Sequence, residues 1–374
     1  MGVRAGRKSN IELLRIFAAC GVIILHYNNG KIGGGFAAVE EGSLNEAIMT
    51  FFEALFICAV NLYVLITGYF MRDSLKRDLL KPVQLLAQLF IIETVFFLIK
   101  EIPHIHEQEN IFKKLLSYYT PSYWFVFVYI ALYIISPYIN LVWKKLDKRN
   151  KRIFLSFSVL LFSIISILTD IFQYHYKENV YGASFISIYG SSEGYTIINF
   201  VLMYLIGCYL RGLEEEGRKY KSIKLFILLV INIFAVFGWV LLDRALTEKN
   251  IFATPAINYN NPLVISAAIL LFLLFKNMNI GSNRVINKLA EASFPAYLIH
   301  INLLEYCNII NMVNGNTGLL ILHIIGTAVV LYVISFLIHM IYDLLTKPVF
   351  KRISGKWNKK RFIDLTEADY TEDK

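Results

Sequence analysis

Ten apolar stretches, each close to the length that crosses a lipid bilayer, constrain this chain more than any other feature. A spanning helix needs about 20 mostly apolar residues. Runs such as Phe154–Leu168 and Leu225–Leu242 are apolar nearly all round, which is typical of helices surrounded by lipid or by other helices. The sequence therefore predicts an all-α integral membrane protein, a bundle of about ten transmembrane helices. The stretches are 11–28, 47–71, 79–100, 122–143, 153–173, 195–211, 223–243, 261–276, 290–310 and 318–346.

The basic residues indicate how these helices are oriented. If the N-terminus is cytoplasmic and the helices alternate, 29 of the 37 Lys and Arg residues fall in cytoplasmic segments and seven in outer loops. Cytoplasmic loops of membrane proteins carry an excess of Lys and Arg. We therefore expect a multi-pass protein of the plasma membrane with both termini in the cytoplasm. This orientation accounts for the excess positive charge, so no nucleic-acid partner is expected.

The domain organisation is expected to be simple. Residues 1–346 form one membrane domain, and residues 347–374 form a cytoplasmic tail, basic and then acidic, that lies beside anionic lipid. No loop is long enough to fold as a soluble domain, so any chemistry falls to the membrane helices and the short loops. The four Cys residues lie in apolar stretches without a paired spacing, which predicts neither a disulfide nor a metal site.

Ionisable residues inside the first stretch suggest a functional site, because such residues are costly at membrane depth. Glu12 and Arg15 are three residues apart and share a helix face. Arg15 and His26 are eleven residues apart, which is three turns plus about 20°, so they also share a face about 16 Å apart along the axis. The alternative is an Arg that reaches the interface and a His that only packs. Arg15 also interrupts the apolar run, which predicts an uncleaved first helix instead of a signal peptide.

Further polar and aromatic residues at membrane depth are candidates for the same site. Trp124 also fits an interfacial anchor, which is a common position for Trp. The sequence contains no nucleotide-binding glycine motif, no metalloprotease motif and no nucleophile-elbow motif. The additional candidates are Asn61, Glu93, Trp124 and His300.

Four stretches together resemble the acyltransferase type 3 family of integral membrane acyltransferases. The first is IELLRIFAACGVIILHY, which holds Arg15 and His26 with ten residues between them. The second is NLYVLITGYFMR, which ends in Arg72 and has Thr67 where the family usually has Ser. The third is YWFVFVYIALYIISPYI, from Tyr123, and the fourth is ASFPAYLIH, which ends in His300.

The resemblance implies a function and roles for several residues. Members of this family move an acyl group, usually acetyl, from cytoplasmic acyl-CoA to a hydroxyl of a cell-surface polysaccharide, a lipid-linked glycan or a related envelope molecule. His26 would be the base or acyl carrier, and Arg15 would position the donor. Arg72 and Arg77 would hold the phosphates of CoA. Tyr69 and Trp124 are further candidates for donor binding. The implied partners are acyl-CoA, a glycan or glycolipid acceptor and membrane lipid, with no metal cofactor.

Elementary chemistry is compatible with this function. A base must remove the proton of the acceptor hydroxyl, and His is suited to that near neutral pH. His26 is therefore expected to line a cavity open to the cytoplasm, where the donor is found. Arg15 is too far along the helix to stabilise the oxyanion, so that partner must come from another helix. The alternative function is a transporter or flippase of glycolipid or envelope intermediates, which would also place charges inside a helical bundle.

Overall fold

The computed structural model of the chain describes residues 7–104, 110–119, 123–176, 192–247, 254–356 and 362–366. These residues are almost entirely helical, as the all-α prediction requires. The α-helices of the first half are α1 (Ser9–Asn28), α2 (Gly35–Ala38), α3 (Leu44–Phe56), α4 (Ala59–Met71), α5 (Leu80–Lys100), α6 (Ile111–Tyr119), α7 (Trp124–Lys145), α8 (Lys148–Val159) and α9 (Ser166–Tyr176). Those of the second half are α11 (Ile197–Glu215), α12 (Ser222–Thr247), α13 (Pro262–Lys276), α14 (Arg284–Leu289), α15 (Ser293–Leu304), α16 (Ile309–Met312) and α17 (Thr317–Lys356).

Short helical turns and two strands complete the described elements. A π-helical turn, η3 (Leu160–Ile165), joins α8 to α9 in one continuous rod. The strands β1 (Lys76–Asp78) and β2 (Phe362–Asp364) pair antiparallel. The 3₁₀ turns are η1 (Ile102–His104), η4 (Ser192–Gly194), η6 (Pro255–Ile257) and η7 (Ala290–Ala292).

Nine helices in the described part of the chain are long and apolar enough to cross a membrane. They correspond to nine of the ten stretches expected from the sequence. The remaining stretch, 290–310, contains α15, which has 12 residues. At 1.5 Å per residue α15 is about 18 Å long, shorter than the roughly 30 Å apolar core of a bilayer. The count of ten is therefore not confirmed by length and composition.

The second membrane helix is broken in its middle. The sequence predicts one helix over 47–71, but α3 ends at Phe56 and α4 begins at Ala59. Neither Pro nor Gly marks the break in the sequence. Irregular backbone at membrane depth is tolerated where it is enclosed by protein or lines a cavity. Ile57, at the break, lines a cavity that is described below.

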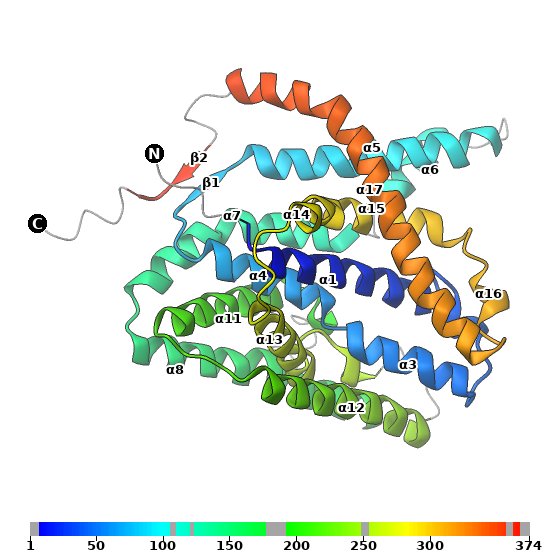
Figure 1. The fold of residues 1–374 in the computed structure, drawn as a ribbon, viewed down its shortest axis with the longest axis horizontal. Coiled ribbons are helices and arrows are strands. Elements are labelled where there is room, and N and C mark those ends of the chain that lie inside the picture. The colour runs from blue at the N-terminus through cyan, green and yellow to red at the C-terminus, as the bar shows by residue number, and fades with distance from the viewer. Residues whose placement is uncertain are drawn as a thin grey trace, which may run out of the picture.

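Ion pairs and hydrogen bonds connect neighbouring loops and helix ends at each end of the bundle. At the end that we call the basic end, Arg7 binds Glu291, and Lys8 and Lys276 both bind Glu214. At the opposite end, the backbone N–H of Glu40 donates to Asn314, and Arg244 binds Glu41 and Glu46. Lys100 binds Glu305 at this end as well. In Figure 1, β1 and β2 lie at the left, on the basic side, and α16 lies at the right.

Two glycines allow α4 and α11 to pack in close contact. A Cβ atom at Gly68 would lie 2.0 Å from the carbonyl oxygen of Tyr204, and one at Gly207 would lie 2.2 Å from that of Leu65. Small residues are the usual means by which membrane helices bring their backbones together. This contact fixes the position of the end of α4, which carries two of the candidate residues, Tyr69 and Arg72.

The last helix continues beyond the expected end of the membrane domain. The boundary expected at residue 346 falls inside α17, which runs to Lys356 and contains Pro348. The chain then returns to the basic end, where β2 pairs with β1. Lys76 binds Asp364 across the pair at 2.8 Å. Part of the tail is therefore docked against the loop that follows α4.

Candidate active site

Two histidines from distant parts of the chain meet inside the bundle. His26 lies near the end of α1, and His300 lies on α15 and is fully buried. Their ring planes are nearly parallel, 11° apart, and their centroids are 4.7 Å apart. Nδ1 of His26 lies 2.5 Å from Nε2 of His300, within hydrogen-bonding distance. The structure thus brings together two residues that the sequence suggested separately.

The hydrogen bonds of this pair assign a tautomer to each ring. Nδ1 of His300 lies 2.7 Å from the carbonyl oxygen of Ala296, so it carries a proton and donates to that oxygen. In the neutral ring Nε2 of His300 is then an acceptor, and Nδ1 of His26 donates to it. Nε2 of His26 keeps its lone pair and has no hydrogen-bond partner among the described residues. His26 is therefore arranged to accept a proton through Nε2.

His26 lines a cavity of about 630 Å³ at the opposite end of the bundle, which we call the outer cavity. We expected His26 to line a cavity open to the cytoplasm; the observed cavity lies at the end away from the basic loops. The reason is that His26 lies three turns beyond Arg15, in the last turn of α1. The lining residues are Leu25, His26, Asn29, Gly30, Lys31, Phe36, Ala37, Glu53, Ile57, Glu193, Tyr195, Ile257, Asn258 and Tyr259.

Aromatic rings form one wall of the outer cavity. Tyr195 and Tyr259 line it, with ring centroids 4.8 Å apart. The ring of Trp124 packs behind them, 4.5 Å from Tyr195 and 5.9 Å from Tyr259 between centroids. Asn61 is fully buried and donates to the backbone carbonyl of Tyr259 at 2.7 Å. Trp124 and Asn61 thus support the wall without lining the cavity themselves.

Arg15 lines a different cavity, which lies nearer the basic end and which we call the inner cavity. Its volume is about 300 Å³, and Tyr63, Thr67 and Tyr129 are among its lining residues. Arg15 binds the carboxylate of Glu12 at 2.8 Å, and its side chain is one-third exposed. Tyr297 also lines the inner cavity, and its ring centroid lies 6.3 Å from that of His300. The helix stripe of Glu12, Arg15 and His26 therefore passes from one cavity to the other.

Glu93 contacts neither cavity but holds α15 in place. Its carboxylate accepts hydrogen bonds from the hydroxyl of Tyr123 at 2.5 Å and from the amide of Asn302 at 3.1 Å. Tyr123 also lies within hydrogen-bonding distance of the carbonyl of Leu298. Since Leu298, His300 and Asn302 all belong to α15, this network fixes the helix that carries His300.

Arg72 lines a third cavity, of about 610 Å³, at the basic end. Its guanidinium binds Asp73 and Glu215, both at 2.8 Å. Partial burial opposes the charge, but the two carboxylates outweigh it and raise the pKa of Arg72 above its usual value. The other basic residues that line this cavity are Lys144, Lys148, Lys151, Arg152 and Arg218.

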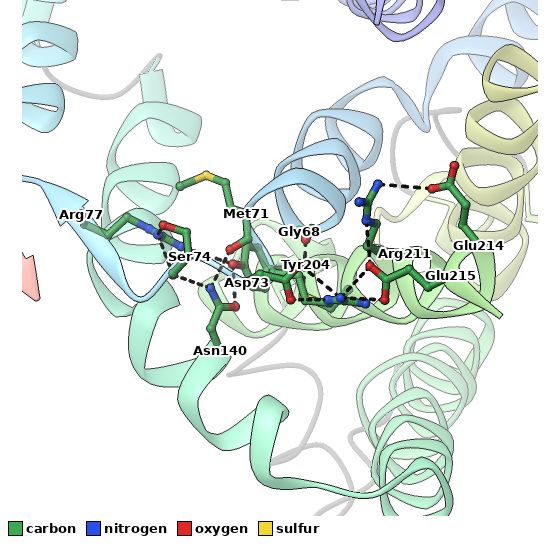
Figure 2. A network of polar contacts seen from close by, with 12 residues as sticks. Gly68, Met71, Asp73, Ser74, Arg77, Asn140, Tyr204, Arg211, Glu214 and Glu215 are labelled. Atoms are coloured by element: carbon green, nitrogen blue, oxygen red, sulfur yellow. Dashed lines mark hydrogen bonds and ion pairs between the residues drawn. The ribbon is translucent and has the colours of Figure 1, made fainter. Parts of the chain in front are cut away.

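Arg77 is buried, with 1% of its surface exposed, instead of facing solvent. It donates to the hydroxyls of Ser136 and Ser74 and to the backbone carbonyls of Ser74 and Lys76. Figure 2 shows it beside Ser74 and Asn140, on the strand β1. Its donors are thus committed to protein acceptors.

Tyr69 is also buried, at the centre of a cationic cluster. Lys8, Arg211 and Lys276 each lie between 5.4 and 5.8 Å from the centroid of its ring. Such distances are typical of cation–π contacts. Its hydroxyl is buried and has no hydrogen-bond partner among the described residues. In the part of the chain that the structure covers, no group of three or more His, Cys, Asp or Glu side chains is arranged to hold a metal ion.

Glu53 is a residue of the outer cavity that was not selected from the sequence. It lies on α3, is 5% exposed, and accepts a hydrogen bond from Asn28 at 3.0 Å. The sequence could have identified Glu53, because it lies inside the apolar stretch 47–71 and a carboxyl group at membrane depth indicates function. Tyr195 and Tyr259 also line this cavity and lie outside the four stretches that resemble the family.

The fold and these cavities define a class, a helical membrane protein with a hydrogen-bonded histidine pair between two cavities. The family model described as an acyltransferase domain, acyltransferase type 3, matches residues 8–340. The chain therefore belongs to the acyltransferase type 3 family, as its four motifs indicated. Comparisons with curated proteins and with solved structures return no match.

Proposed function

We propose that the protein transfers an acyl group, acetyl in the simplest case, from cytoplasmic acyl-CoA to a hydroxyl of an envelope glycan or lipid-linked glycan. Family membership supports acyl transfer in general. The single observation that carries the finer proposal is the hydrogen-bonded pair of His26 and His300 at the wall of the outer cavity. It gives His26 a fixed orientation and leaves its Nε2 unpaired among the described residues, and His26 lines a space large enough for a substrate.

We also propose that the chain crosses the plasma membrane ten times, with both termini in the cytoplasm. Glu291, before α15, binds Arg7 at the basic end, whereas Glu305, after α15, binds Lys100 at the opposite end. The short α15 thus passes from one end of the bundle to the other. The pairing of β2 with β1 also needs an even number of crossings between them, which the inclusion of α15 supplies. The basic end is then cytoplasmic by the distribution of Lys and Arg.

The chemistry assigned to His26 is general base catalysis. Nε2 takes the proton of the acceptor hydroxyl while the hydroxyl oxygen attacks the thioester carbon. The carbon–sulfur bond then breaks, and the CoA thiolate leaves with a proton from the imidazolium. The new oxygen–carbon bond gives the acyl ester. During this step the bond from Nδ1 to His300 keeps the ring oriented, as the aspartate does for the histidine of a Ser-His-Asp triad.

The donor is assigned to the cytoplasmic half of the protein. Arg15 and the inner cavity are about three helix turns on the cytoplasmic side of His26, so they lie along the path of an extended acyl-CoA arm. Arg72 and the basic cavity around it supply positive charge for the phosphates, with guanidinium groups suited to bidentate binding. Arg77 is committed to Ser74, Ser136 and Lys76, and we assign it to holding the loop in place.

The acceptor is assigned to the outer cavity. Tyr195 and Tyr259 present aromatic faces, with Trp124 behind them, and such rings suit the apolar faces of sugar rings. Asn258 and Glu53 add polar groups to the same cavity. Donor and acceptor would thus approach His26 from opposite sides of the membrane.

The experiment that tests this function uses purified protein in proteoliposomes with labelled acetyl-CoA and an envelope glycan fraction. We expect release of free CoA thiol together with alkali-labile label on the glycan. Movement of a labelled glycolipid across the bilayer without any consumption of thioester would instead support the flippase alternative. Absence of acyl transfer under all conditions would contradict the proposal.

A further inference from the structure

A buried carboxyl group, that of Glu53, lines the outer cavity and has no role in the chemistry assigned to His26. Glu53 lies on α3, one turn before the break at Ile57, and both residues line the cavity. It is 5% exposed, whereas the other carboxyl that lines the cavity, Glu193, is on the surface. A carboxyl group at this depth is costly to bury unless its oxygens are hydrogen-bonded.

Only one oxygen of Glu53 is bound by the described residues. Oε2 accepts a hydrogen bond from Nδ2 of Asn28 at 3.0 Å. The same Nδ2 donates to the carbonyl of Met49, also at 3.0 Å, so the Asn28 amide is itself fixed. Oε1 receives no hydrogen bond from the part of the chain that the structure covers. Asn28 therefore holds the carboxyl group and leaves one oxygen for a ligand in the cavity.

We propose that Glu53 binds the acceptor, through a hydrogen bond that a second hydroxyl donates to Oε1 while His26 deprotonates the first. The acceptor is then a polyol, such as a sugar unit with neighbouring hydroxyls, and an acceptor with a single hydroxyl is a poor substrate. This role rests on the proposed function, because it assigns the acceptor to the outer cavity. Glu53 is a binding and specificity residue and takes no part in proton transfer.

The substitution Glu53→Gln separates this role from a structural one. The Gln carbonyl can still accept from Asn28, so the contact between α1 and α3 is kept. The group left for the ligand becomes an amide N–H₂, a donor in place of an acceptor. If Glu53 only joined two helices, Gln would serve nearly as well. If it binds the acceptor, affinity for the acceptor falls while the reaction of the donor continues.

The experiment measures acetyl transfer from acetyl-CoA to methyl hexosides and to their monodeoxy counterparts, with hydrolysis of acetyl-CoA followed separately by thiol release. The loss of a hydrogen bond that leaves a buried acceptor unsatisfied changes affinity by about 10- to 100-fold. We expect the wild-type protein to prefer the hexoside over the analogue that lacks the neighbouring hydroxyl by about this factor. In Glu53→Gln the KM for the hexoside rises about 10-fold or more, the preference is lost, and thioester hydrolysis is unchanged. Glu40→Gln, an exposed carboxylate outside the cavity, is the matched control.

Three results would overturn the proposal. The first is a Glu53→Gln protein with wild-type KM and wild-type preference. The second, which needs no variant, is a wild-type protein that acetylates hexosides and deoxyhexosides equally. The third is transfer to no hexoside at all while His26-dependent thioester hydrolysis persists, which would exclude a polyol acceptor but leave the donor half of the proposed function intact. Absence of hydrolysis as well would contradict acyl transfer itself, and the role of Glu53 with it.

Discussion

Replacement of His300 tests whether the histidine pair orients the base. In His300→Phe, Nδ1 of His26 loses the partner that it now meets at 2.5 Å, and a buried N–H is left without an acceptor. An unsatisfied buried donor costs about 1–3 kcal/mol. The ring can relieve that cost only by turning away from its catalytic orientation or by changing tautomer. If this free energy is lost from the transition state, kcat falls about 5- to 150-fold, since 1.4 kcal/mol corresponds to tenfold.

The assay is steady-state acetyl transfer, with KM for acetyl-CoA and kcat determined separately. We expect the loss in kcat, because His300 contacts His26 and not the inner cavity to which the donor arm is assigned. His300→Gln is the rescue variant, since its side-chain carbonyl can accept from His26 in place of Nε2. A His300→Phe protein with the wild-type kcat, or a Gln variant no better than Phe, would refute the orienting role.

Three further predictions concern the basic half of the protein. Gly68→Ala places a methyl group 2.0 Å from a backbone carbonyl oxygen and should lower the free energy of unfolding by about 1–3 kcal/mol. Gly238→Ala is the control, because its methyl group meets nothing within 4 Å and should not destabilise the protein. Thermal unfolding in detergent compares the two variants. Arg77→Lys should lower the unfolding temperature without changing the KM for acetyl-CoA, since lysine cannot make the several directed hydrogen bonds of the guanidinium. A rise in the KM at wild-type stability would indicate instead that Arg77 binds the phosphates. Hydrogen bonds from Lys76 and then Thr366 lower the pKa of Asp364 to about 2. The pairing of β2 with β1 should therefore persist at neutral pH and weaken as pH falls from about 4 through 2. Amide exchange at Phe362–Leu365 measures this pairing, and Asp364→Asn should remove its pH dependence.

The sequence predicted the membrane helices well because apolar length is a local property. It also predicted that Arg15 and His26 share a stripe of one helix, which depends only on helix geometry. The break between Phe56 and Ala59 was not predicted, because no Pro or Gly marks it in the sequence. A full span was predicted over 290–310, whereas α15 within it has 12 residues, with Glu291 before it and Glu305 after it.

The site was predicted in part, for a similar reason. His300 was selected as a candidate, but its contact with His26 joins residues 274 positions apart, which no local pattern reveals. Arg77 was interpreted as a phosphate ligand because it lies in a basic loop, yet the docking of that loop buries it. Glu53 was overlooked although its charge inside an apolar stretch was visible.

His26 is proposed as the general base that deprotonates the acceptor hydroxyl during acyl transfer, and one measurement tests this role most directly. Acetyl transfer from acetyl-CoA is followed for the wild type and for His26→Ala, with folding checked by thermal unfolding and with His323→Ala as a second-histidine control. General base catalysis contributes about 10²- to 10⁴-fold, so the account predicts a loss of at least that order in His26→Ala. A folded His26→Ala protein that transfers the acetyl group at the wild-type rate would contradict it.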